Sequence, residues 1–229
     1  MNTNLRTTIH NAEYDTGKTS YLTKVLTWLA AALGATATIT FLIAPHIPAT
    51  LLTAAWVITS ILVIILLLVS IWVRASKTYW LAPLTLLLFS TATGIDLYFI
   101  IVAALHNPHY GSVAVAALAV TSVVFVVMAI LGWVTRLDLS RFGVMAMVAL
   151  LVLIVLSIIN SLFLHLPILA FIISCVTALV FMFFTAYDFQ VIKNKGYGSI
   201  PASMMALSVF IDFWGLFKNI INIFSFLDQ

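Results

Sequence analysis

The sequence contains very little charge, since Asp, Glu, Lys and Arg together make up 7% of its 229 residues. A soluble domain carries roughly 25% charged residues, so this chain cannot cover itself with a water-exposed polar surface. Apolar residues make up 64% of the sequence and the mean hydropathy is +1.20. This composition indicates a protein surrounded by a lipid bilayer, which we expect to be its principal partner.

Cysteine is nearly absent, because Cys175 is the only one and lies within an apolar run. A single cysteine excludes an intrachain disulfide and a cysteine-ligated metal site. No nucleic-acid motif is present either. The net charge of +3 comes from residues at the ends of apolar runs, which indicates membrane topology rather than nucleic-acid binding.

The first twenty residues lack the basic start and small-residue cleavage site of a signal peptide. We therefore expect residues 1–20 to form a polar cytoplasmic tail and residues 21–229 to form a single transmembrane domain. Seven apolar runs follow the tail, each long enough to cross a hydrocarbon core of ~30 Å as a helix. They cover residues 21–44, 50–73, 79–104, 111–134, 142–164, 168–192 and 200–227. The sequence thus predicts an all-α integral membrane protein with seven transmembrane helices.

Lys and Arg are distributed unevenly over the connections between the runs. Nine of the ten basic residues fall on the N-terminal tail and on alternate connections. They are Arg6, Lys18, Lys24, Arg74, Lys77, Arg136, Arg141, Lys193 and Lys195. Because cytoplasmic loops carry the excess of basic residues, this pattern predicts a cytoplasmic N-terminus and an external C-terminus.

Two carboxylates interrupt the last two apolar runs: Asp188 in "TAYDFQVIK" and Asp212 in "SVFIDFWGLF". At ~1.5 Å of rise per residue, Asp212 lies about 16 Å after Pro201 and Asp188 about 12 Å before Gly196. Since consecutive helices run antiparallel, we expect both carboxylates at a similar depth in the cytoplasmic half. They could face each other there.

Polar and small residues recur along the seventh run with steps of four, three, four and three. They are Ser208, Asp212, Gly215, Asn219 and Asn222. This spacing places them on one face of a helix. Because polar side chains in hydrocarbon are costly, we expect this face to turn inward as a pore-lining stripe. The alternative is a set of isolated polar residues bonded to the backbone.

Two carboxylates in a poorly hydrated site tend to share one proton. Such a pair suits a proton-sensitive switch, a cation site or an acid–base catalyst. The alternative is that each carboxylate is neutralised by a nearby Lys or Arg. Acids within membrane spans are functional by default, which favours the first group of interpretations.

The segments "YDFQVIK" and "MALSVFIDFWGLFKNIINIF" resemble the Bax inhibitor-1 family, and most closely its bacterial branch. The family pattern is Tyr-Asp-x-Gln-x-Ile at the end of the sixth helix. It continues with Ala-Leu-x-x-x-x-Asp-x-x-x-Leu-Phe in the seventh. The motifs cover about the last fifty residues, whereas the seven-helix count and the orientation extend the likeness over nearly the whole chain.

The resemblance implies six helices around a central C-terminal seventh, and a pH-sensitive calcium leak across the bacterial plasma membrane. It implies that Asp188 and Asp212 form a hydrogen-bonded pair that senses pH and gates the leak, and that Arg74 in "SIWVRASK" latches onto it. Calcium would be the ion transported and weakly bound by the two carboxylates, together with water. Calcium and protons are then the expected partners, and we expect neither an organic cofactor nor an enzymatic activity.

Three positions depart from the family pattern. The second run has no acid, whereas some bacterial relatives carry a glutamate there. Gly215 replaces a common Asn, and Lys218 replaces a residue that is usually apolar. These differences concern ion affinity and conduction more than the fold.

Asp96, in "TATGIDLYFI", is a third acid within an apolar run. It lies seventeen residues after Tyr79, and Lys218 lies seventeen residues after Pro201. Both helices start on the cytoplasmic side, so Asp96 and Lys218 share a depth in the outer half. We hypothesise an ion pair between them. The alternative is that Asp96 lines the outer pore while Lys218 extends toward the surface.

Four of the five histidines fall on the external connections, namely His46, His106, His109 and His165. A metal site or an external pH sensor is one interpretation. No carboxylate accompanies them in the sequence, and solvated loops explain them as well.

Three other functions compete with the leak. An intramembrane aspartyl protease also uses a Tyr-Asp and a second Asp, but Asp212 lacks the Gly-x-Gly-Asp context of those enzymes. A retinal protein would use a lysine of the last helix such as Lys218, but its N-terminus would lie outside. An interaction protein that modulates membrane partners without conducting ions fits the sequence too.

Overall fold

The computed structural model of this protein describes residues 3–46, 49–194 and 200–228, with the side chains of residues 20–42, 44, 46, 57–194 and 200–228. This part of the chain contains seven long helices, and each is long and apolar enough to cross a membrane. They are α1 (Thr3–Thr38), α2 (Ala49–Ser76), α3 (Ala82–His106), α4 (Pro108–Val134), α5 (Ser140–Ile159), α6 (Pro167–Asn194) and α8 (Ala202–Leu227). Short π-helices η1 (Ile39–Ile43) and η4 (Asn160–Leu164) and 3-10 helices η2 (Ala44–His46) and η3 (Tyr79–Leu81) extend them.

The seven helices confirm the predicted all-α fold with seven spans. The main difference lies at the N-terminus, where α1 begins at Thr3 and its backbone is helical through most of the stretch predicted as a polar tail. The side chains of residues 1–19 lie outside the described part, so the division at residue 20 stays a prediction.

Asparagine side chains fix two of the chain reversals. Asn107 precedes Pro108, whose fixed φ suits the first helical position. The Asn107 Oδ1 atom accepts hydrogen bonds from the backbone N–H groups of His109 and Tyr110 and so caps α4. Asn160 bonds both backbone groups of Leu166, and this clamp closes the π-helical turn between α5 and α6.

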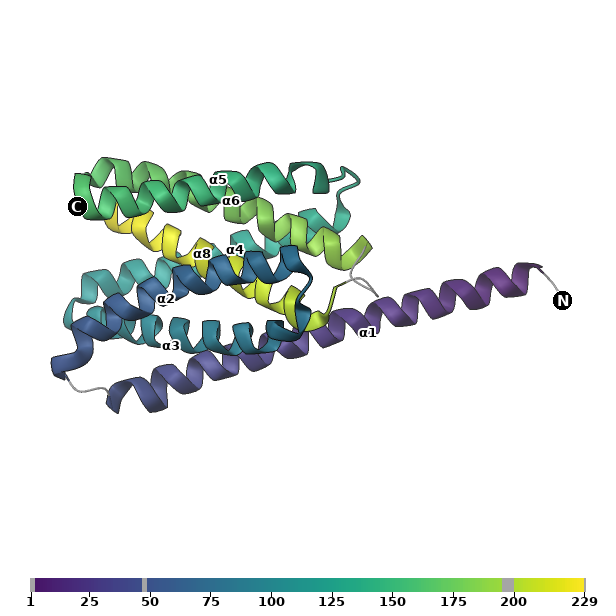
Figure 1. The fold of residues 1–229 in the computed structure, drawn as a ribbon, viewed down its shortest axis with the longest axis horizontal. Helices are drawn as coiled ribbons and strands as arrows, with labels where there is room; N and C mark the ends of the chain where they lie inside the picture. Colours follow the sequence, from purple (N-terminus) through teal and green to yellow (C-terminus); the bar gives the residue numbers. More distant parts are fainter. Residues whose placement is uncertain (1–2, 47–48, 195–199, 229) are drawn as a thin grey trace.

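The C-terminal helix α8 lies at the centre of the bundle and crosses it between the other helices (Figure 1). In its most apolar stretch 78% of the residues are buried, against 39% in α3 and 6% in α5. It packs against α1, α2, α3, α4 and α6, whereas α5 packs chiefly on the outer side of α6. This arrangement explains why polar residues are tolerated on α8, since its side chains meet protein instead of lipid.

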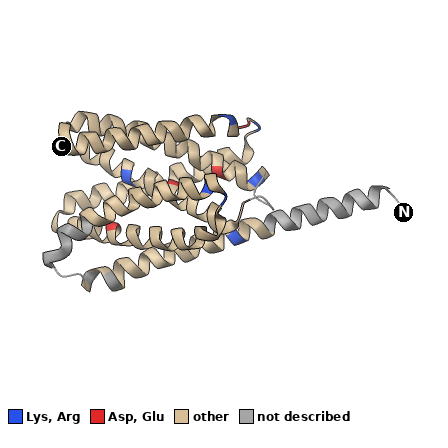
Figure 2. Ribbon diagram, viewed as in Figure 1, with Lys and Arg blue, Asp and Glu red and all other residues tan. Residues whose placement is uncertain are grey.

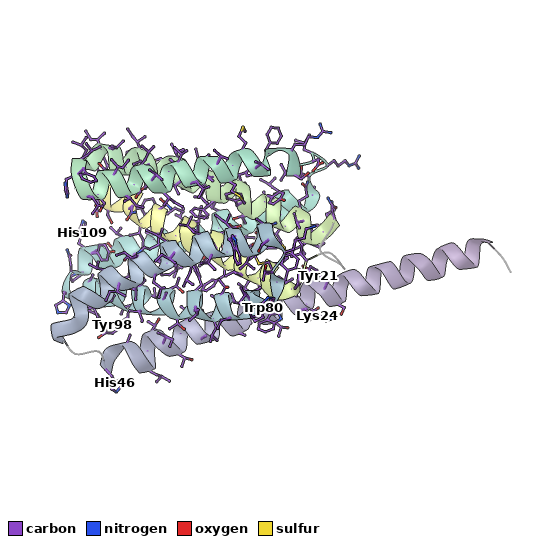
Figure 3. All side chains as sticks on the ribbon, in the orientation of Figure 1. Tyr21, Lys24, His46, Trp80, Tyr98 and His109 are labelled. Atoms are coloured by element: carbon purple, nitrogen blue, oxygen red, sulfur yellow. The ribbon has the colours of Figure 1, made fainter. Side chains whose placement is uncertain are left out.

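Basic residues gather toward one end of the bundle, which we call the basic end (Figure 2). Apart from Lys218 of α8, the basic residues with described side chains are Lys24, Arg74, Lys77, Arg136, Arg141 and Lys193. Arg6, Lys18 and Lys195 lie outside the described side chains. Tyr21, Lys24 and Trp80 mark the basic end in Figure 3, and His46 and His109 mark the opposite end. The charge asymmetry predicted from the sequence therefore has a spatial counterpart.

Candidate functional site: a buried acidic pocket beside a larger cavity

Arg74 and Asp188 form an ion pair at the basic end of the bundle. Arg74 stands in the last turn of α2 and Asp188 near the end of α6, and Arg74 Nη1 lies 3.1 Å from Asp188 Oδ1. The same nitrogen donates a hydrogen bond of 3.1 Å to Ser208 Oγ on α8. The Asp188 side chain is 3% exposed and that of Arg74 is 23% exposed. One guanidinium thus ties α2, α6 and α8 together.

Asp212 lies in the same pocket, one helical turn beyond Ser208 on α8, and is buried. It is close enough to Asp188 and Arg74 for electrostatic interaction with both. Its Oδ2 atom has no hydrogen-bond partner among the described residues. A buried carboxylate oxygen without a partner costs free energy, so this atom is the least satisfied polar group of the pocket.

The pocket around these side chains is small. It has a volume of about 60 Å³ and is bounded by Arg74, Asp188, Ser208 and Asp212 together with apolar residues of α2, α5, α6 and α8. We call it the acidic pocket. Within the described part of the chain, no group of three or more His, Cys, Asp or Glu side chains could hold a metal ion. Since Ca²⁺ prefers six to eight oxygen ligands, two carboxylates would need water to complete a site.

The neighbours of Asp188 in the "YDFQ" segment each have a structural role. The Tyr187 ring lies 5.5 Å from the Arg74 guanidinium carbon and supports it by a cation–π contact. Gln190 accepts a hydrogen bond from the Leu139 N–H and donates one to the Leu137 carbonyl, which holds the connection between α4 and α5. The sequence alone did not predict these roles of Tyr187 and Gln190. The motif itself was the only signal for them.

A second, larger cavity of about 600 Å³ lies farther from the basic end, between α5 and α8. The polar stripe of α8 divides between the two spaces. Ser208 and Asp212 border the acidic pocket, and Gly215, Asn219 and Asn222 border the large cavity. All five residues therefore border one of the two spaces, although Asn222 is also exposed. The Asn219 amide also donates a hydrogen bond to the Gly215 carbonyl, so backbone bonding occurs on this face too.

Four apolar side chains border both spaces and separate them. They are Leu67 from α2, Leu150 from α5, Phe181 from α6 and Ile211 from α8. We call this set the apolar collar. Gly215 explains how the Phe181 ring fits there, because a Cβ atom at Gly215 would collide with three carbons of that ring. The collar therefore lies where the acidic pocket and the large cavity adjoin.

Asp96 and Lys218 form an ion pair on the wall of the large cavity, with Lys218 Nζ 3.3 Å from Asp96 Oδ2. This is the contact that their equal depth predicted. The Asp96 side chain is 2% exposed and that of Lys218 is 34% exposed. Thr59 on α2 donates a hydrogen bond of 3.1 Å to the second carboxylate oxygen, Asp96 Oδ1.

The histidines at the opposite end are exposed and form no metal cluster within the described chain. No carboxylate stands near the histidines in the sequence, but the fold places Asp228 Oδ2 2.6 Å from His109 Nε2. Asp228 follows α8 directly, and the fold brings it next to the start of α4. The two residues are far apart in the sequence, so this contact could not be predicted from it.

The sequence model of the family described as "Inhibitor of apoptosis-promoting Bax1" matches residues 18–229. The chain belongs to this family, the Bax inhibitor-1 family. The match includes both motifs and all seven spans. Membership therefore agrees with the resemblance that the last two helices carry.

Similar proteins occur in several bacteria. An uncharacterized protein of Helicobacter pylori is 37% identical over 107 residues, which are 47% of this chain and 45% of that protein. An uncharacterized protein of Campylobacter jejuni is 31% identical over 145 residues, 62% of each chain. An uncharacterized membrane protein of Streptococcus pyogenes is 34% identical over 146 residues, 61% of each chain. The chain thus spans about half to three fifths of the length of these relatives. With its seven apolar helices, the protein is an integral membrane protein.

Proposed function

We propose that this protein is a pH-sensitive calcium leak of the bacterial plasma membrane, with its N-terminus and basic end in the cytoplasm. The observation that carries the proposal is the acidic pocket, in which Arg74 holds Asp188 while a buried oxygen of Asp212 has no partner among the described side chains. Membership in the family and the gathering of basic residues at one end support it.

The path of the ion follows the two internal spaces. The large cavity leads from the outer half of the bundle to the apolar collar, and the acidic pocket continues on the cytoplasmic side. Hydrophobic constrictions prevent conduction by excluding water. We take the arrangement in which Arg74 bridges three helices and the collar lies between the two spaces to be the closed state of the leak.

Gating follows from the charge in the acidic pocket. With one proton shared by Asp188 and Asp212, the pocket contains one negative charge, which the Arg74 guanidinium balances. A change in this proton count alters the attraction between α2, α6 and α8, because Arg74 contacts a residue of each of the other two helices. The collar draws one side chain from each of these three helices, so their displacement opens it. Calcium is the cargo, and the two carboxylates with water give it a weak site on its way.

Two features of the acidic pocket disfavour peptide hydrolysis. Catalytic carboxylate pairs activate a water molecule between them, whereas here the Arg74 guanidinium binds Asp188. A pocket of about 60 Å³ also has no room for a peptide segment.

The proposal is tested by calcium entry into liposomes that contain the purified protein and a calcium dye. We expect entry above that of protein-free liposomes, with a rate that changes with pH. Asp188→Asn should raise the rate, because it releases Arg74 from α6. Asp228→Asn is the matched control, since this exposed carboxylate lies far from the pocket. Absence of entry at every pH would overturn the proposal and favour a non-conducting modulator.

A further inference from the structure

The two partners of the ion pair in the large cavity are held to different degrees, with Asp96 held more firmly than Lys218. The Asp96 carboxylate is almost completely buried, and it is held by Thr59 on one oxygen and by Lys218 on the other. Lys218 reaches it through a single contact of 3.3 Å on a flexible four-carbon chain, and about a third of its side chain is exposed. The ammonium group can therefore leave without any movement of the carboxylate.

The Arg74–Asp188 pair shows what a more rigid arrangement looks like in the same fold. Arg74 Nη1 makes two hydrogen bonds of 3.1 Å, to Asp188 and Ser208, and the Tyr187 ring lies 5.5 Å from the guanidinium carbon, so three neighbours hold the guanidinium. Lys218 has one carboxylate contact and the Trp214 ring 5.9 Å away. Both surroundings are typical of a cation, but Lys218 borders a cavity of about 600 Å³, whereas Arg74 borders a pocket of about 60 Å³.

The wall of the large cavity offers further polar groups beside this pair. Asn219 and Asn222 border the same space, and their side-chain carbonyl oxygens are ligands that inorganic cations accept. The buried Trp214 Nε1 atom has no hydrogen-bond partner among the described residues. A cavity of about 600 Å³ with such walls has room for several water molecules, which can hydrate an ion there.

We propose that Asp96 is a cation site of the large cavity and that the Lys218 ammonium is its tethered occupant. An inorganic cation that enters the cavity exchanges with Lys218 at the carboxylate. Lys218 thereby keeps the wall electrically neutral while the site is idle and lowers its affinity for free cations. The inference deepens and rests on the proposed calcium leak, for which it supplies an outer site. Its test is a binding measurement, so it can fail while the leak is confirmed, and the reverse.

The test measures the unfolding temperature, Tm, of the purified full chain in detergent, with and without calcium chloride. Lys218→Met leaves Asp96 without its ammonium, and calcium should then raise Tm by on the order of 5 °C at saturation. In the double variant Asp96→Asn/Lys218→Met this calcium-dependent rise should be lost. The wild type gives the baseline for all other calcium sites. Lys24→Met is the matched control, because this lysine is exposed at the basic end.

The outcomes separate a cation site from a merely structural ion pair. A Lys218→Met protein that unfolds without calcium and folds with it supports the proposal as strongly as the Tm rise does. A calcium effect in Lys218→Met no larger than in the wild type or in the double variant overturns it. Failure of Lys218→Met to fold with or without calcium, while the double variant folds, overturns it too, because no free cation then replaces the ammonium.

Discussion

Replacement of Arg74 by methionine is the most informative perturbation of the closed arrangement. Methionine retains much of the apolar stem but removes the guanidinium, with its contact of 3.1 Å to Asp188 and its hydrogen bond of 3.1 Å to Ser208. Asp188 then stays 97% buried without a charge partner. The variant therefore isolates the cost of an uncompensated carboxylate between packed helices.

The expected loss of stability can be worked out from the burial of the pair. Removal of one partner of a buried ion pair costs about 3–5 kcal/mol. Arg74 is 23% exposed, so water can partly replace it and the lower value, about 3 kcal/mol, applies. For a chain of this length this corresponds to a decrease in Tm of about 6–12 °C. The double variant Arg74→Met/Asp188→Asn contains no unpaired charge and should lie within about 1 kcal/mol of the wild type.

Stability can be measured through Cys175, which is the only thiol of the chain and lies on α6. The rate at which a thiol-reactive dye labels it during heating reports the unfolding of α6. Arg141→Met removes an exposed arginine of the basic end and serves as the matched control. The reasoning is refuted if Arg74→Met is no less stable than Arg141→Met. It is equally refuted if the double variant is as unstable as Arg74→Met alone.

Glycine positions give further predictions for the same thermal assay and for the liposome assay. Gly215→Ala should lower the free energy of unfolding by about 1–3 kcal/mol and raise calcium entry, because its Cβ displaces the Phe181 ring from the collar. The additional change Phe181→Leu should restore stability. If Gly215→Ala changed neither stability nor calcium entry, the close packing of Gly215 against Phe181 would be contradicted. Gly132→Ala should cost about 3 kcal/mol, because its Cβ would lie within contact distance of the rigid Ala186 backbone. In the control Gly34→Ala the added Cβ meets nothing within 4 Å, so the variant should gain up to ~1 kcal/mol of stability from its higher helix propensity. Equal losses of stability in Gly34→Ala and Gly132→Ala would argue against a close contact of α4 with α6.

The seven spans could be predicted because each apolar run is much longer than the boundary error. The depth of individual residues could be predicted as well, since helical rise is constant. Helical rise alone places Asp96 at the same depth as Lys218, and Asp188 at the same depth as Asp212. Arg74 could be placed only through the resemblance, because rise alone does not say which face of α2 turns inward.

Other features could not be predicted from one sequence. The apolar collar draws single residues from four helices, and Leu67 or Ile211 resembles any lipid-facing residue of a run that is apolar all around. The contact of His109 with Asp228 depends on how the end of α8 meets the start of α4. The π-helical turn at Asn160 depends on a clamp to Leu166 that no local propensity encodes. Each of these depends on helix packing, which composition does not specify.

The central claim is that the protons shared by Asp188 and Asp212 control a calcium path, and Asp212→Asn tests it most directly. Asparagine retains the shape of the side chain but cannot take up or release a proton. Calcium entry into liposomes is measured from mildly acidic to mildly alkaline pH for the wild type, Asp212→Asn and the control Asp228→Asn. We expect entry to change with pH in the wild type and in Asp228→Asn and to be independent of pH in Asp212→Asn. An unchanged pH dependence in Asp212→Asn would contradict it.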